Sequence, residues 1–197
     1  VSGKTADAVA TLSGGNEGTD TVHATISYTL GTGVENLTLA TGAGNIDGTG
    51  NAAANVITGN GGDNVLSGLG GVDTLTGKGG ADTFVFGKGE TGATAATRDI
   101  ITDFEVGTDK IDVSGFGQFR FLGNAAFDGQ ADALHYVAGS TIDEGDINGD
   151  KIADFQIELT GSLTLTENDF TANSVVLPQI KTGDGNPNTL EGERGND

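Results

Sequence analysis

Side-chain oxygens recur at a fixed interval in the middle of the chain. Between Gly50 and Phe86, four nine-residue units stand in phase: GNAAANVIT, GNGGDNVLS, GLGGVDTLT and GKGGADTFV. The sixth position of each unit carries an amide or carboxylate oxygen, from Asn55, Asn64, Asp73 and Asp82 in turn. Oxygen atoms of these kinds are the ligands that calcium takes in proteins. The repeat therefore predicts oxygen-lined calcium sites.

Glycine and apolar residues occupy other fixed positions of each unit and must position these oxygens. Position 1 is always glycine, which can adopt the positive φ of a sharp turn. Position 8 is a large apolar residue that a three-residue strand would turn inward. These residues are Ile57, Leu66, Leu75 and Phe84. Two units therefore make one flattened coil of turn, strand, turn and strand.

Successive turns lie on alternate edges of such a coil, so neighbours on one edge are 18 residues apart in the sequence. Asn55 should then face Asp73 on one edge, and Asn64 should face Asp82 on the other. Turn carbonyls would complete an oxygen-rich cage for calcium, and Asp99, 17 residues after Asp82, would close the last site. Without an ion the stacked carboxylates would repel one another, which disfavours a metal-free glycine-rich solenoid.

The four units resemble the calcium-binding nonapeptide G-G-x-G-x-D-x-U-x of the RTX family, in which U is a large apolar residue. The resemblance covers residues 48–86 and implies an all-β fold, a right-handed parallel β-roll. It also implies a ligand set, in which Asn64 would serve as a neutral ligand. The set comprises the turn residues Gly62, Gly71 and Gly80 and the carboxylates of Asp73 and Asp82. Asparagine at position 6 and Ala53 in place of a turn glycine predict that the first coil binds more weakly.

The segments around the repeat divide the chain into four parts. Alternating apolar residues predict an N-terminal β-strand cap over 1–47, and the β-roll follows over 48–97. The segment 98–178 begins with RDIITDFEVGTDKIDVSGF, which resembles the β-rich segment after the roll in serralysin-type proteases and mannuronan C5-epimerase R-modules. A linker and the start of a second array, GDGNPNTLE, are predicted over 179–197.

Further acids follow the repeat. The resemblance implies that Asp99 completes the terminal site, whereas Asp103, Asp109 and Asp112 are either ligands or turn caps, or simply exposed loop acids. A second oxygen pattern, DINGDKIAD, places four residues at positions 1, 3, 5 and 9 of an EF-hand-like spacing. These are Asp146, Asn148, Asp150 and Asp154. Lys151 stands where an EF-hand needs glycine, so a calcium-stabilised turn and an ordinary Asx-rich hairpin turn are equal alternatives.

Composition excludes several classes of function. The net charge is −19, with 28 acidic and 9 basic residues, which argues against nucleic-acid binding. The chain has no cysteine and two histidines, which removes disulfides and a zinc cluster. No apolar run approaches the ~20 residues of a membrane span. The sequence contains no HExxH or GxSxG motif, so we expect no catalytic activity in this module.

The resemblance implies a non-catalytic module of a larger secreted bacterial RTX protein. Such a module leaves the cell unfolded by type I secretion and folds outside on binding Ca²⁺, where it stabilises its parent. Two alternatives remain open. One is a carbohydrate-binding R-module of an epimerase, with alginate as an anionic partner, although the basic residues are few. The other is a spacer or adhesion segment of a large surface protein; in every case the other domains of the parent chain are partners.

Overall fold

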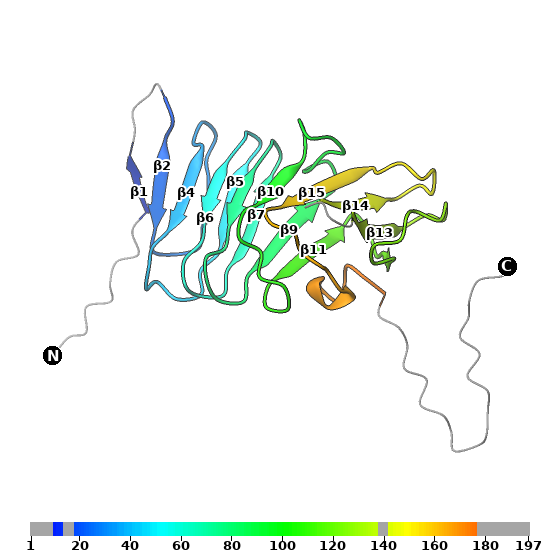
Figure 1. Ribbon diagram of the computed structural model, residues 1–197. Helices are drawn as coiled ribbons and strands as arrows, with labels where there is room; N and C mark the ends of the chain where they lie inside the picture. Colours follow the sequence, from blue (N-terminus) through cyan, green and yellow to red (C-terminus); the bar gives the residue numbers. More distant parts are fainter. Residues whose placement is uncertain (1–9, 14–17, 138–141, 177–197) are drawn as a thin grey trace, which may run out of the picture.

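The computed structural model describes residues 10–13, 18–137 and 142–176 (Figure 1). The second array expected after Gly183 lies outside these residues. Within them, the regular structure consists of strands and a single turn of 3-10 helix, η1 (Glu167–Asp169), with no α-helix. No described helix is long and apolar enough to cross a membrane.

Consecutive strands in the middle of the chain alternate between two sheets and pair in parallel within each sheet. The first sheet receives β2 (Thr21–Ala24), β4 (Asn36–Leu39), β6 (Val56–Thr58), β8 (Thr74–Thr76) and β10 (Asp99–Ile101). The second receives β3 (Tyr28–Thr29), β5 (Gly48–Asn51), β7 (Val65–Leu69), β9 (Thr83–Gly87) and β11 (Lys110–Gly115). This stack of coils confirms the predicted all-β parallel β-roll (Figure 1).

The position-8 residues form the core of the roll. In the first sheet Ile57 pairs with Leu75, and Leu75 with Ile101. In the second sheet Leu66 pairs with Phe84, and Phe84 with Ile111. All of these side chains are completely buried, as the repeat predicts. Each contributes about 1.5–3 kcal/mol by leaving water, so the column of apolar residues holds the two sheets together.

The roll continues beyond the nonapeptide units. It runs from Thr21 to Gly115, whereas the sequence placed it over 48–97. The coils added before Gly48 lack the glycine-and-acid turns but still supply inward apolar residues such as Val22 and Leu37, and a matching inward residue is what parallel stacking requires. Strand β1 (Ala10–Ser13) pairs antiparallel with β2 and is the last strand on that side of the sheet.

Four strands extend the first sheet past the end of the roll. Strand β15 (Phe155–Leu159) pairs in parallel with β10 and is followed by β14 (Ile142–Asp146), β13 (Ala133–Tyr136) and β12 (Arg120–Phe121). Aromatic side chains fill the space inside this extension. The ring of Phe155 stacks on Phe116 at 4.0 Å and meets Phe119 edge-on at 5.6 Å. The predicted β-rich segment therefore packs on the roll by sharing its sheet.

One acid of this extension is buried away from the turns of the roll. Asp143 of β14 is completely inaccessible to solvent, and neither of its carboxylate oxygens has a hydrogen-bond partner among the described residues. Burial raises the pKa of Asp143 well above its ordinary value, with a smaller contribution from the charge of Glu144. Burial of this carboxyl group therefore favours its neutral form.

Candidate metal centre

The sixth-position residues form two rows, one along each edge of the roll. The first edge row consists of Asn55, Asp73 and Asp99, each just before or at the start of a strand of the first sheet. The second edge row consists of Asn64, Asp82 and Asp109, each just before a strand of the second sheet. All six residues are at most 3% exposed, although the four aspartates among them would ordinarily lie in water.

Each acid is bound to the residue before it in its row. In the first edge row, the backbone N–H of Asn55 donates to Oδ1 of Asp73 (2.7 Å), and the N–H of Asp73 donates to Oδ1 of Asp99 (2.8 Å). In the second edge row, the N–H of Asn64 donates to Asp82 (2.8 Å), and that of Asp82 to Asp109 (3.0 Å). The predicted pairs are therefore adjacent, and one oxygen of each acid is committed to the row.

The second carboxylate oxygen lies in a crowded environment that glycine creates. Oδ2 of Asp73 is buried and has no hydrogen-bond partner among the described residues. A Cβ atom at Gly68 would lie 2.1 Å from this oxygen, and one at Gly77 would lie 2.2 Å from Oδ2 of Asp82. Position 1 must therefore be glycine. A buried carboxylate oxygen without a donor is suited to a cation, which satisfies it without a proton.

Backbone carbonyls of adjacent coils lie beside the turn glycines. Gly71 precedes Asp73 by two residues on the first edge, and Gly62 and Gly80 hold the same place before Asn64 and Asp82 on the second. A Cβ at Gly71 would lie 2.6 Å from the carbonyl oxygen of Ala53, and one at Gly80 would lie 2.7 Å from that of Gly62. The predicted turn residues are thus stacked coil on coil, with carbonyl oxygens between them.

Burial changes the acidity of both rows. It raises the pKa of Asp73 and of Asp82 to about 6 and that of Asp99 to about 7, against hydrogen bonds from the row that act in the opposite direction. The pKa of Asp109 is raised for the same reason. Neighbouring acids add smaller upward contributions, including Glu90 at the first edge and Asp103 at the second. A bound cation would lower these pKa values again, because it favours the ionised form of each carboxyl group.

The spacing of 17 residues predicted that Asp99 follows Asp82 in its row, but the structure places it elsewhere. It lies after Asp73, 26 residues further on, because the segment between β9 and β10 is longer than a repeat unit. Asp109 takes the place after Asp82 and completes the second edge row. The signal for it was present in GTDKID (107–112), which matches the G-x-D-x-U-x half of the nonapeptide.

Asn55 and Asn64 have both polar side-chain atoms engaged inside the roll. Oδ1 of Asn55 accepts the N–H of Asn51 (2.7 Å), while Nδ2 donates to the carbonyl oxygens of Val34 and Glu35 (both 3.2 Å). Asn64 likewise accepts from Asn60 and donates to the carbonyl of Ile46 (2.6 Å). An amide N–H₂ can satisfy carbonyls that would otherwise need a cation. This arrangement favours asparagine as the end of each row, and its role as a calcium ligand stays a prediction.

The second oxygen pattern forms the turn between β14 and β15. Asp146 accepts the N–H groups of Gly149 (2.7 Å) and Lys151 (2.9 Å), and Asn148 accepts that of Asp150 (2.8 Å). Asp150 accepts the N–H of Ile152, and Asp154 that of Ile147. The turn thus satisfies its own acids, which favours the Asx-rich hairpin alternative. Calcium binding here stays a prediction.

Carboxylates alone do not make a centre in the described part of the chain, where no three His, Cys, Asp or Glu side chains converge on one point. Alternating turns and strands with stacked glycines and acids define a β-roll module of the RTX type. The family model described as "Peptidase M10 serralysin C terminal" matches residues 33–172, and the chain belongs to that family.

A search of solved structures finds a more distant likeness. It matches the solution structure of the AlgE6R3 subunit of the mannuronan C5-epimerase from Azotobacter vinelandii, with 25% identity over 78% of this chain and 91% of the other. The TM-score is 0.39. A comparison with curated protein sequences finds no significant match.

Replacing Asp109 tests whether the second edge row extends to this residue. We expect Asp109→Asn to weaken calcium binding by about tenfold or more, as Asp82→Asn should, because calcium affinity depends on the number of charged ligands. Isothermal titration with calcium measures the effect. The control is Asp132→Asn, which removes the same charge from an exposed loop position. A wild-type isotherm for Asp109→Asn would contradict the assignment.

The raised pKa values predict how stability without calcium depends on pH. The folded chain takes up protons at pKa values of about 6 to 7, whereas the unfolded chain does so near 3.8. Their stabilising contribution is therefore complete below about pH 4 and is lost as the pH rises through 6 to 7. In EDTA, the thermal unfolding midpoint should be higher at pH 5 than at pH 8. With calcium present, the gain due to the ion should shrink as the pH falls.

Replacing the acids provides the control for this pH dependence. The double variant Asp73→Asn/Asp99→Asn should show a flatter change of midpoint between pH 8 and pH 5 in EDTA. A wild-type midpoint that falls on acidification over this range would contradict the pKa shifts as the cause.

Proposed function

We propose that the chain is a calcium-dependent, non-catalytic module of a larger secreted bacterial protein, which it helps to fold and stabilise outside the cell. The observation that carries this proposal is the buried Oδ2 of Asp73, which has no hydrogen-bond partner among the described residues. The other oxygen of the same carboxylate, Oδ1, accepts the N–H of Asn55 in the adjacent coil. Membership of the serralysin C-terminal family supports it, since β-rolls of this type are known for binding calcium.

The proposed ligands come from successive turns of the same edge. On the first edge Asp73 and Asp99 would hold the ion with carbonyls of the adjacent turns, and on the second edge Asp82 and Asp109 would do so. Calcium supplies positive charge between carboxylates that otherwise repel one another. The residues of the chain contribute the rigid glycine turns and the row of N–H donors that fixes one oxygen of each acid.

Calcium binding would couple folding to location. An ion that binds the folded chain alone stabilises it by about 2.7 kcal/mol per site at a free concentration of 100 times the dissociation constant. The coil edges do not exist in the unfolded chain, so binding and folding occur together. In a low-calcium cytoplasm the acids would then keep the chain loose, which suits export before folding. An extracellular medium would close the roll.

The positions of the histidines support a non-catalytic role. His23 is exposed on β2, at the opposite end of the first sheet from His135 on β13. His135 is paired with Glu144 at 3.0 Å. An acyl-transfer triad needs a hydroxyl or thiol nucleophile beside its histidine, whereas the ion-pair partner of His135 is a carboxylate.

Alginate binding receives less support from the charges. Among the basic residues, Arg98 is paired with Glu158 and Arg120 with Asp128, while Lys110 donates to the carbonyl of Asn168. An anionic polymer would need a continuous row of unpaired cations on a chain whose net charge is −19. We therefore place the polysaccharide function second.

Far-ultraviolet circular dichroism with calcium titrated into EDTA-stripped protein tests the proposed function. We expect a cooperative gain of β signal with calcium and little response to the same concentration of magnesium, because Mg²⁺ prefers octahedral sites that keep its waters. A protein already folded in EDTA and indifferent to calcium would overturn the proposal.

A further inference from the structure

The outer face of the first sheet carries a cleft that the roll does not explain. It has a volume of about 550 Å³ and lies over strands β13, β14 and β15, beyond the last coil. Its wall includes the side chains of Phe127, His135, Glu144, Lys151, Ile152 and Gln156. Cavities of this size with an apolar lining and a few placed polar groups are typical of small-ligand sites.

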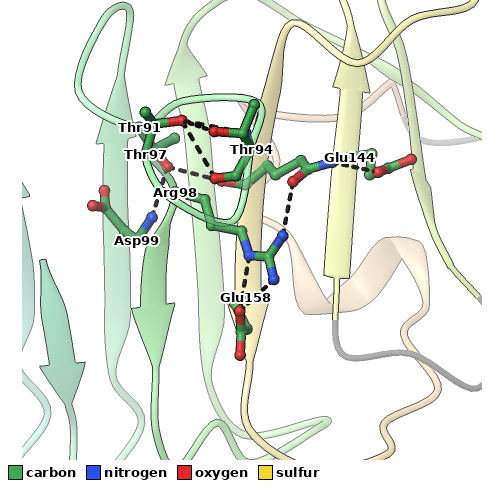
Figure 2. A network of polar contacts seen from close by, with 8 residues as sticks. Thr91, Thr94, Thr97, Arg98, Asp99, Glu144 and Glu158 are labelled. Carbon is green, nitrogen blue, oxygen red and sulfur yellow. Dashed lines mark hydrogen bonds and ion pairs between the residues drawn. The ribbon is translucent and has the colours of Figure 1, made fainter. Parts of the chain in front are cut away.

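The polar wall of the cleft is held in place by a chain of hydrogen bonds across three strands. Nε2 of Gln156 donates to Oε1 of Glu144 (2.7 Å), and the ring of His135 contacts the other oxygen at 3.0 Å. Arg98 donates to Oε1 of Gln156 (3.0 Å). Arg98 is itself held by Glu158 (2.6 Å), as Figure 2 shows. The carboxylate of Glu144 is thereby oriented before any ligand arrives.

Lys151 supplies a positive charge to the cleft from a strained backbone conformation. Its φ is +69°, a left-handed conformation that costs an ordinary residue energy and that glycine adopts freely. Its stem lies over Gly129, where a Cβ would meet Cε of the lysine at 2.6 Å. No ion pair joins its ammonium group to any described residue, in a chain with 28 acids. Strained residues of this kind cluster at ligand sites.

The remaining wall is apolar. Phe127 packs on the ring of His135, with ring centroids 4.3 Å apart, and Ile152 is 69% exposed next to Lys151. Alanines 93, 126 and 153 complete the lining. The cleft therefore offers one cation, one fixed carboxylate and an apolar surface between three loops.

We propose that this cleft binds a small zwitterion of the amino-acid type, with an apolar side chain. Its carboxylate would pair with Lys151, its ammonium group with Glu144, and its side chain would lie against Phe127 and Ile152. A ligand with balanced charges is favoured over a simple anion, because the net charge of −19 repels anions from the whole surface. The site is separate from the edge rows and does not rest on calcium binding in the roll.

The test is an NMR titration of the isotope-labelled, calcium-loaded chain with L-phenylalanine. We expect saturable shifts at His135, Glu144 and Lys151, with a dissociation constant of about 1 mM or below, as a ligand of this size allows. Two analogues serve as probes of charge. 3-Phenylpropionate lacks the ammonium group and phenethylamine lacks the carboxylate, and each should bind at least about tenfold more weakly.

The variant Lys151→Gly separates binding from folding. It relieves the left-handed strain, so the thermal midpoint should rise or stay unchanged while binding weakens at least about tenfold. Lys78→Gly is the matched control, since Lys78 has φ +74° in a turn of the roll that does not line the cleft. The control should bind as the wild type does.

Three results would overturn the proposal. They are the absence of saturable shifts at the cleft up to about 50 mM phenylalanine, wild-type binding by Lys151→Gly, and equal binding of 3-phenylpropionate, which would mark a plain anion site. A chain that needs no calcium to fold would leave this test intact, so the two proposals fail separately.

Discussion

The structure depends on carboxylates that are stacked one strand spacing apart at the buried edges of a roll. Adjacent strands lie about 4.8 Å apart, so an acid at the same place in every coil must face the next acid. Backbone N–H groups stabilise one oxygen of each acid by hydrogen bonding. The N–H of Asn55 donates to Asp73, and that of Asp73 donates to Asp99. The other oxygen of Asp73 has no donor among the described residues and requires a proton or a cation, whereas that of Asp109 accepts the N–H of Glu105. Burial without a cation raises the pKa values, and glycine at position 1 leaves the room that the second carboxylate oxygen occupies.

The nonapeptide determined most of what could be predicted from the sequence. A period of nine with glycine, acid and apolar columns specifies turn, ligand and core together, so the flattened coil and the pairs Asn55/Asp73 and Asn64/Asp82 follow from the spacing. The right-handed parallel roll is what the resemblance to the RTX nonapeptide implies. The extent of the roll did not follow, because coils such as Thr21–Leu39 keep the inward apolar residues but lose the turn signature. The role of Asp109 does not follow from the sequence, because the long segment before β10 interrupts the nine-residue period from which the ligand positions are counted.

The second oxygen pattern shows the limit of spacing as evidence. The acids of DINGDKIAD have the intervals of a calcium loop, yet backbone N–H groups of the same turn already occupy them. Lys151, which stands where the calcium loop needs glycine, adopts the left-handed backbone conformation that glycine would adopt without strain. The carboxyl-terminal extension thus differs from the roll in kind. Its polar groups are oriented toward an open cleft, whereas those of the roll are turned toward one another.

The most direct test of the account is to locate calcium in the folded chain. Crystals grown with calcium, measured at a wavelength where calcium scatters anomalously, should show peaks along both edges, beside Asp73 and Asp99 and beside Asp82 and Asp109. The peaks should be absent between the turns of Asn55 and Glu35, where amide donors occupy the carbonyls. An ordered roll without anomalous density beside these acids would contradict the account.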